Sequence, residues 1–285
     1  MTERSSRWRD LGTRVASAIV MIALTLAALW AGPVIWVIFV FVVYCIMIWE
    51  LAPLCDPGLS TARRWALAPL PLMFPVVTLA VPILSGVEIF GPVVEGTRPW
   101  GLFDAGYITG MVGLMAPVVA GMALLGAGRL LWIAYGSMLA AAALFLCYAY
   151  GEHGVAGLVT LVSIVVISDT AGYFAGRALG GPKFWPAISP KKTWSGTVAG
   201  WIGAGVFGLI VLPLFGVPLL VSGLVAVIIC FAAQLGDIAE SAIKRHAGVK
   251  DASALIPGHG GVLDRLDALV AAAFLAGLIT LGTGG

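Results

Sequence analysis

The residues that could do chemistry gather near the end of the chain, between positions 236 and 267. This stretch holds five acids, four Lys or Arg residues and two histidines, although only 11% of all residues are charged. Asp237, Glu240, Ser241 and Lys244 are spaced i, i+3, i+4 and i+7, which places them on one face of a predicted helix. Two interpretations are open: the face lines a polar site, or it is a solvated helix extension with a Glu240–Lys244 ion pair.

A glycine-rich turn, Pro-Gly-His-Gly-Gly at 257–261, separates this face from a second acidic group. Gly260 and Gly261 allow the backbone to approach a ligand closely. His259 could bind phosphate or make a local hydrogen bond, and the sequence leaves both open. Asp264 and Asp267 follow one turn apart, at the start of the last apolar segment.

A third polar segment, residues 181–196, contains three prolines and is therefore not expected to form one continuous helix. Lys191 and Lys192 stand just before the next predicted helix, whose N-terminus favours anions. The two ammonium groups suit a phosphate, and they equally suit anchoring to anionic lipid headgroups. The segment lacks the Gly-x-x-x-x-Gly-Lys-Ser/Thr pattern of a P-loop.

A lone acid, Asp169, lies inside an apolar segment. An ionised carboxylate there costs about 2.5–3.5 kcal/mol, so we treat Asp169 as a candidate functional residue. Gly172, Gly176 and Gly180 follow at four-residue spacing, a pattern typical of close helix packing.

Carboxylates on several helix ends, beside lysines and glycine turns, form a set suited to metal-bound phosphates. Mg²⁺ prefers hard oxygen ligands, commonly a few carboxylates together with substrate phosphate and water. At the bilayer centre the charges of residues 237–267 would cost on the order of 20–30 kcal/mol. They are therefore expected at the membrane interface or around a wet cavity.

The elements that must position these groups are membrane helices, since 60% of the 285 residues are hydrophobic. Apolar windows long enough to span a bilayer predict an all-α polytopic membrane protein with nine helices. The windows lie near 15–31, 33–52, 66–84, 106–126, 130–149, 154–174, 196–214, 217–235 and 266–282.

The distribution of basic residues predicts the orientation. A cytoplasmic N-terminus puts 15 of the 16 Lys and Arg residues in cytoplasmic segments, with only Arg98 outside. We read the first window as a retained helix rather than a signal peptide, because further apolar windows follow at once. Residues 1–150 are expected to be scaffold helices, and residues 151–285 the catalytic half of one integral domain. The four scattered cysteines have no metal-binding spacing.

These polar segments resemble the signature of the CDP-diacylglycerol synthases, also called phosphatidate cytidylyltransferases. The stretches "ISPKKTW" at 188–194 and "SDTAGYFAG" at 168–176 resemble the family too, so the resemblance covers about residues 165–270. Ser195 stands where the family pattern leads us to expect Glu. The residues that match the signature, with every spacing kept, are Ser241, Ile243, Lys244, Arg245, Lys250, Asp251, Ser253, Ile256, Pro257, His259, Gly260, Gly261, Val262, Asp264, Arg265, Leu266 and Asp267.

The resemblance implies an enzyme of phospholipid biosynthesis that transfers CMP from CTP to phosphatidate, giving CDP-diacylglycerol and pyrophosphate. It implies one or two Mg²⁺ ions held by Asp237 and Asp264, with Asp267 and Asp169 in support. Lys244 and Arg265 join the three aspartates Asp237, Asp264 and Asp267 as catalytic residues. The residues expected at substrate phosphates are Lys191, Lys192, Arg245, Lys250, His259, Gly260, Gly261 and Ser241.

The same resemblance implies CTP, phosphatidate and membrane lipids as partners, with a homodimer possible and no nucleic acid. The protein is expected in the inner membrane, with a site that faces the cytoplasm and opens sideways to the bilayer.

Three other roles compete with this one. A secondary transporter also carries intramembrane acids and glycine-broken helices, but no inverted repeat is evident and the charges collect at one face. An alcohol phosphatidyltransferase would need an Asp-Gly-x-x-Ala-Arg run, which the sequence lacks. A non-catalytic membrane scaffold would leave the polar face unexplained.

Overall fold

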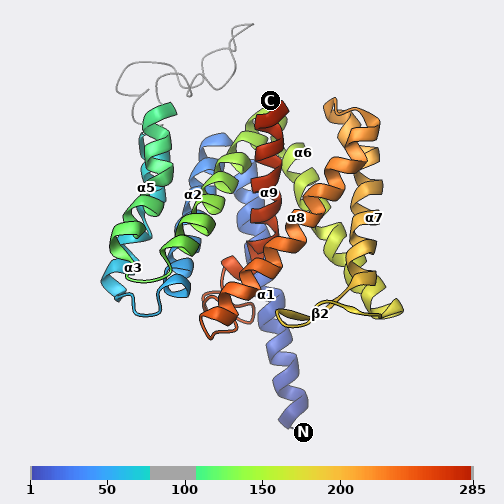
Figure 1. Ribbon diagram of the computed structural model, residues 1–285, viewed down its shortest axis with the longest axis horizontal. Coiled ribbons are helices and arrows are strands. Elements are labelled where there is room, and N and C mark those ends of the chain that lie inside the picture. Colours follow the sequence, from blue (N-terminus) through green and yellow to red (C-terminus); the bar gives the residue numbers. More distant parts are fainter. Residues whose placement is uncertain (1, 78–106, 284–285) are drawn as a thin grey trace, which may run out of the picture. The chain divides into compact units, whose positions relative to one another are not determined.

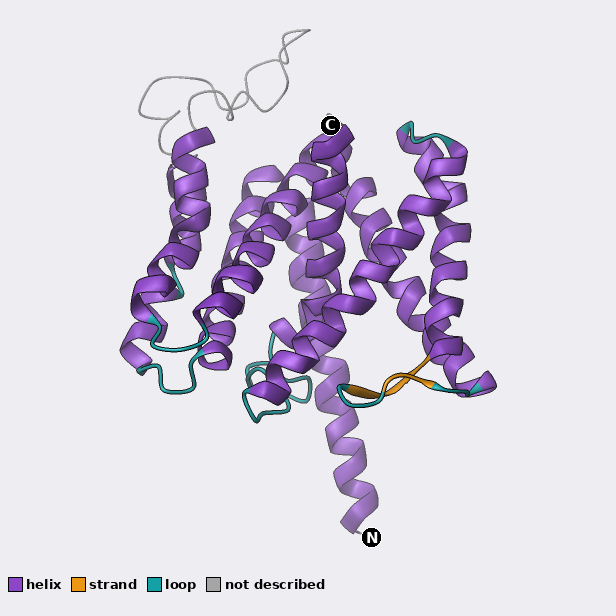
Figure 2. Ribbon diagram, in the orientation of Figure 1, coloured by secondary structure: helices purple, strands orange, loops and turns teal. Residues whose placement is uncertain are grey.

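The computed structural model describes residues 2–77 and 107–283 and is built almost wholly of helices (Figure 1 and Figure 2). A two-stranded antiparallel sheet of β1 (Lys183–Trp185) and β2 (Ser189–Thr193) joins α6 to α7. The expected helical membrane protein is confirmed, although no sequence pattern predicted the hairpin. The helices are α1 (Thr2–Trp30), α2 (Pro33–Cys55), α3 (Thr61–Leu67), α5 (Tyr107–Leu124), α6 (Arg129–Leu179), α7 (Trp194–Val211), α8 (Leu219–His246) and α9 (Leu263–Thr283), with short 3₁₀ turns η1 (Leu70–Leu72) and η3 (Leu212–Phe215).

Six helices of the described chain are long and apolar enough to cross a membrane. They are Gly12–Trp30, Pro33–Cys55, Arg129–Leu179, Trp194–Phe215, Leu219–His246 and Leu263–Thr283. The described apolar part of α5, Gly113–Leu124, is shorter than a span needs. The count of nine spans therefore stays a prediction, as does the cytoplasmic N-terminus.

The long helix α6 covers two of the predicted spans. Its 51 residues would measure about 75 Å if straight, more than twice the thickness of a bilayer core. Gly154 interrupts it with φ 59° and ψ −150°, a backbone conformation outside the helical region. This interruption falls at the expected boundary between the windows 130–149 and 154–174.

The predicted window 66–84 is helical only in pieces where the structure describes it. α3 ends at Leu67 and η1 takes up Leu70–Leu72, because Pro69 and Pro71 cannot donate the backbone bonds of a regular helix. The rest of this window, from residue 78, and the loop around 85–105 with Arg98 lie outside the described residues.

Residues 22–140 form one compact unit, and residues 1–21 together with 141–285 form the other. Aromatic side chains organise the first unit: Phe41 stacks on Phe74 with ring centroids 4.7 Å apart, and Trp132 Nε1 donates to Val118 O at 3.1 Å. The assignment of a scaffold role to residues 1–150 stays a prediction. Every residue proposed for the site lies in the second unit.

Small residues bring the helices of the second unit close together. A Cβ atom on Gly196 of α7 would lie 2.5 Å from Gly172 O of α6, so only glycine fits that crossing. The interpretation of Gly172 as a packing residue is thereby supported. Gly180 differs, because its φ is +61° and a Cβ there would meet nothing within 4 Å. It ends α6 in a left-handed conformation instead of packing.

The hairpin sets the position of the two predicted phosphate-binding lysines. Thr193 ends β2 and caps α7, with its hydroxyl accepting from Gly196 N at 3.3 Å. Lys191 and Lys192 are neighbours on β2, and successive side chains on a strand point to opposite faces. Lys191 is exposed and Lys192 is half-buried, so the two lysines do not act from the same side.

Candidate active site

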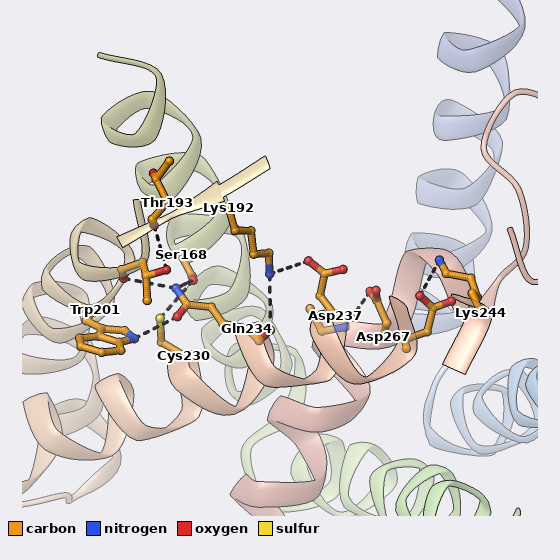
Figure 3. Close-up of polar contacts among 12 residues, drawn as sticks. Ser168, Lys192, Thr193, Trp201, Cys230, Gln234, Asp237, Lys244 and Asp267 are labelled. Carbon is orange, nitrogen blue, oxygen red and sulfur yellow. Dashed lines mark hydrogen bonds and ion pairs between the residues drawn. The ribbon is translucent and has the colours of Figure 1, made fainter. Parts of the chain in front are cut away.

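The crossing of α8 and α9 brings acids from both helices together. A Cβ atom on Gly236 would lie 2.7 Å from Asp267 O, so the two backbones touch at this glycine. The next residue, Asp237, lies beside Asp267, and the two carboxyl groups interact electrostatically (Figure 3). Asp267 is 9% exposed and accepts a hydrogen bond from Ala268 N at 2.8 Å.

Lys192 reaches this acidic pair from the hairpin. Its Nζ lies 2.5 Å from Asp237 Oδ2 and 3.4 Å from Gln234 O (Figure 3). Asp169 on α6 also interacts electrostatically with Lys192 and Asp237. Residues from α6, β2, α8 and α9 thus meet in one group, which we call the Asp237 cluster: Asp169, Lys192, Asp237 and Asp267.

A second group forms one helical turn further along α8. Lys244 Nζ lies 2.5 Å from Glu240 Oε2 and 2.6 Å from Asp264 Oδ1 on α9. Asp264 Oδ2 accepts hydrogen bonds from Ala252 N at 2.9 Å and Gly261 N at 2.7 Å. We call Glu240, Lys244 and Asp264 the Lys244 cluster. It ties α8, the turn and α9 together, so the predicted Glu240–Lys244 pair exists but is buried rather than solvated.

The carboxylate of Glu240 is the least satisfied acid of the Lys244 cluster. Glu240 is fully buried, and its Oε1 has no hydrogen-bond partner among the described residues. Leaving a buried oxygen unpaired costs free energy unless something else supplies a donor, a proton or a cation.

The glycine turn is held by its own backbone. Ile256 N donates to Gly260 O at 2.7 Å, and His259 N donates to Ile256 O at 2.9 Å. Gly260 has φ +84°, and a Cβ there would lie 2.7 Å from Asp264 Oδ2, so this position requires glycine for two reasons. The predicted close approach at Gly260 is made by the Asp264 carboxylate.

Two further predicted residues, His259 and Arg265, meet at the same turn. Arg265 Nε donates to His259 O at 2.9 Å. The His259 ring lies against α1, with Nδ1 2.7 Å from Ser17 Oγ.

Other predicted phosphate-binding residues lie outside the two clusters. Arg245 is exposed and donates to Val249 O at 3.1 Å, and Ser241 is half-buried. Lys191 and Lys250 are exposed, and neither makes an ion pair or side-chain hydrogen bond within residues 2–77 and 107–283. Their roles stay predictions.

Sequence reasoning missed a buried amide beside the Asp237 cluster, that of Gln234. Gln234 Oε1 accepts from Trp201 Nε1 at 3.0 Å, and Gln234 Nε2 donates to Ser168 Oγ at 3.2 Å (Figure 3). This amide joins α6, α7 and α8 one helical turn before Asp237. Its position three residues before Asp237, on the same helical face, is the signal that could have indicated it.

The donor set fits a hard divalent cation at the Asp237 cluster better than at Asp264. Among the described residues no group of three or more His, Cys, Asp or Glu side chains converges as a ready metal site. Mg²⁺ needs only one or two carboxylates when substrate phosphates and water complete its shell. Asp237 and Asp267 present two adjacent carboxyl groups, whereas both oxygens of Asp264 already have donors.

Comparisons with known proteins indicate the family to which the chain is related. A profile described as the cytidylyltransferase family matches residues 12–281, which is nearly the whole chain. Proteins named phosphatidate cytidylyltransferase in four bacterial genera are similar to part of this chain. The Brucella suis protein is 46% identical over 153 residues, covering 50% of this chain and 55% of the relative.

Two more distant relatives carry the same name. The Haemophilus influenzae protein is 42% identical over 126 residues, covering 42% of this chain and 44% of its own. The Bacillus subtilis protein is 35% identical over 145 residues, covering 46% and 52%. The matched region therefore spans about half the length of these curated relatives.

Proposed function

The chain belongs to the cytidylyltransferase family, and we propose that it transfers CMP from CTP to phosphatidate, giving CDP-diacylglycerol and pyrophosphate. The relatives named phosphatidate cytidylyltransferase supply the substrate class. The observation that carries the proposal is the pair of clusters on α8 and α9, in which lysines and carboxylates from separate elements contact one another. Such groups can exchange their partners for phosphates.

In the proposed reaction a phosphate oxygen of phosphatidate attacks the α-phosphorus of CTP. The new O–P bond forms as the bond from the α-phosphorus to the bridging oxygen breaks, and pyrophosphate leaves with that electron pair. No protein nucleophile is required. Because both reactants are anionic, the protein's work is to hold them in line and to neutralise their charge.

The lysines of the two clusters are suited to binding and neutralising the anionic substrates. Lys192 and Lys244 each have their ammonium group on carboxylates, at 2.5 Å from Asp237 and 2.6 Å from Asp264. We assign both lysines, together with Arg265, to phosphate oxygens of the substrates. Lys191, Arg245 and Lys250 are exposed and would meet phosphates at the outer edge.

Asp237 and Asp267 are the residues that we propose to hold Mg²⁺, with Asp169 in support. When bound, the ion would neutralise phosphate charge as a Lewis acid. Asp264, which the sequence also nominated, would have to release Lys244 or two backbone N–H groups to serve as a ligand. We therefore assign it to holding the turn and Lys244.

The place of the site follows from its two substrates. CTP is soluble, whereas the acyl chains of phosphatidate stay in lipid, so the clusters should lie at a membrane interface. Bacterial relatives fit the inner membrane, and the basic residues favour the cytoplasmic face. The sideways opening to the bilayer and the homodimer stay predictions.

The test is transfer of label from [α-³²P]CTP to phosphatidate by the purified protein in detergent with Mg²⁺. We expect labelled lipid, with one unlabelled pyrophosphate released for each labelled lipid formed. A folded protein that makes no lipid-linked CMP contradicts the proposal. Substituting CDP-diacylglycerol and an alcohol for the substrates tests the competing phosphatidyltransferase, and flux of phosphatidate or nucleotide into vesicles without reaction would favour a transporter.

A further inference from the structure

The N-terminal helix contacts the glycine turn of the candidate site, although the two are separated by most of the chain. Ser17 Oγ of α1 lies 2.7 Å from His259 Nδ1 and 3.1 Å from Pro257 O. Arg14, one turn earlier, lies against the same turn, since a Cβ on Gly258 would be 2.8 Å from Arg14 Cγ. The family profile begins at residue 12, so it includes this part of α1.

The contacts of Ser17 indicate which nitrogen of His259 donates to it. The hydroxyl group has one hydrogen, and three atoms lie within hydrogen-bonding distance of its oxygen: Arg14 O at 3.0 Å, Pro257 O and His259 Nδ1. The two carbonyl oxygens can only accept, and the Ser17 hydrogen can serve only one acceptor at a time. More of these groups are paired when that hydrogen goes to a carbonyl, so we assign the Nδ1–H of His259 as the donor to Ser17 Oγ.

Three of the four polar atoms of His259 have hydrogen-bond partners, and the fourth, Nε2, has none among the described residues. Its N–H donates to Ile256 O, its carbonyl accepts from Arg265 Nε at 2.9 Å, and its Nδ1 is bonded to Ser17. Nε2 is the remaining polar atom, and it has no protein partner within the described part of the chain. The ring is thus oriented with one defined nitrogen available to a ligand.

We propose that Ser17 is a positioning residue: it accepts the Nδ1–H of His259 and so holds the ring with Nε2 towards a phosphate-bearing substrate, to which the imidazolium form of the ring donates its Nε2–H. The proposal rests on the proposed function, because it names phosphate as the ligand of Nε2. It also gives residues of α1 a part in the site beyond membrane anchoring. Arg14 lies over the same turn and is placed to add positive charge there.

A mutant cycle tests whether Ser17 acts through His259. Ser17→Ala should lower kcat/KM about tenfold, the effect of losing one hydrogen bond, while Ser17→Thr keeps the hydroxyl and should stay within about threefold of wild type. In a His259→Ala background, Ser17→Ala should change nothing further. Effects that multiply would show that Ser17 acts independently of His259 and would overturn the proposal.

The matched control is Ser222→Ala. The Ser222 hydroxyl also lies within hydrogen-bonding distance of two backbone carbonyls, Val217 O at 3.2 Å and Pro218 O at 3.1 Å. It lies at the start of α8, whereas the two clusters lie near the end of that helix. We expect its kcat/KM to match the wild type. A loss equal to that of Ser17→Ala would mean that any lost serine hydroxyl harms the protein, and would contradict a positioning role.

A readout without turnover separates this proposal from the proposed function. In protein labelled with ¹⁵N-histidine, the His259 resonances should show protonated Nδ1 in the wild type and in Ser17→Thr, and a tautomer mixture in Ser17→Ala. Adding CTP should shift Nε2. An unchanged tautomer in Ser17→Ala overturns the positioning role, even in an active enzyme. A wild type with the expected tautomer but no CMP transfer refutes the proposed function alone.

Discussion

The two units of the molecule satisfy their charged side chains in different ways. In the unit of residues 22–140, Asp56 and Arg64 bond to backbone: Asp56 accepts from Gly126 N at 2.8 Å and Gly58 N at 3.0 Å, and Arg64 Nε donates to Trp49 O at 2.7 Å. In the unit of residues 1–21 and 141–285, Lys192 and Lys244 instead pair with carboxylates from other elements.

The difference separates structural charges from charges that can bind a ligand. A side chain whose polar atoms all bond to backbone, as both carboxylate oxygens of Asp56 do, holds a loop and leaves no atom for a ligand. Arg64 is held in a second way, since it also lies 3.3 Å above the Trp49 ring, where burial lowers the pKa of its guanidinium. Paired side chains can release each other when phosphate arrives. Substitutions of the paired residues in the unit of residues 1–21 and 141–285 should therefore reduce turnover, whereas substitutions of Asp56 or Arg64 should reduce stability alone.

The largest expected effect on stability comes from Asp264→Ala. This change strips Lys244 of a partner at 2.6 Å and leaves two backbone N–H groups without an acceptor. Breaking such a buried pair should reduce the free energy of unfolding by about 3–5 kcal/mol. Asp56→Ala, which removes backbone contacts alone, should cost about 1–2 kcal/mol. Denaturant unfolding in detergent measures both, and equal losses would contradict the distinction.

Asp267→Asn should have the largest effect on turnover. Asn keeps the shape of the side chain but removes the charge beside Asp237, so we expect kcat/KM to fall about 10²–10³-fold. The thermal midpoint should change little, because the hydrogen bond from Ala268 N can still be accepted. Near-normal turnover with the protein folded would remove Asp267 from the proposed cation site.

The two lysines of β2 offer a matched pair. Lys192→Ala should lower kcat/KM about 10²-fold, because its ammonium group supplies the positive charge of the Asp237 cluster. Lys191→Ala should change it less than about threefold, since an exposed charge is screened by water and salt. Steady-state kinetics at one ionic strength compare them. The reverse order would show that the strand presents the other lysine to the substrate.

The smallest expected effect is at the helix crossing beneath the acids. Gly236→Ala would place a methyl group 2.5 Å from Ala271 Cβ, and such overpacking should cost about 1–3 kcal/mol of unfolding free energy. Gly12→Ala is the control, because a Cβ there would meet nothing within 4 Å. It should be neutral or slightly stabilising. The shift in thermal midpoint of each variant provides the measurement.

The sequence predicted the parts of the site that depend on local spacing. Helical periodicity placed Asp237, Glu240 and Lys244 on one face, and the structure pairs Glu240 with Lys244 as that spacing implies. Gly260 was predicted to let a ligand come close, which stays a prediction; the structure gives it φ +84° and sets the Asp264 carboxylate beside it. These features follow from residues within a few positions of one another.

The parts that could not be predicted depend on partners distant in the chain or on the local backbone type. Ser17 and His259 are 242 positions apart, and nothing in the spacing of either residue indicates the other. Lys191 and Lys192 were predicted to bind phosphate together before a helix. The two residues lie on a strand instead, where Lys191 is exposed and Lys192 is half-buried. The nine predicted spans likewise depend on residues 78–106, which lie outside the described structure.

One measurement tests most directly whether the exchangeable charges form the active site. Asp237→Asn and Asp56→Asn proteins are purified in parallel, and the initial rate of CMP transfer from [α-³²P]CTP to phosphatidate is compared with that of the wild type. The account predicts a loss of about 10²–10³-fold for Asp237→Asn and a rate within about twofold for Asp56→Asn. Equal rates for the two variants, both folded, would contradict it.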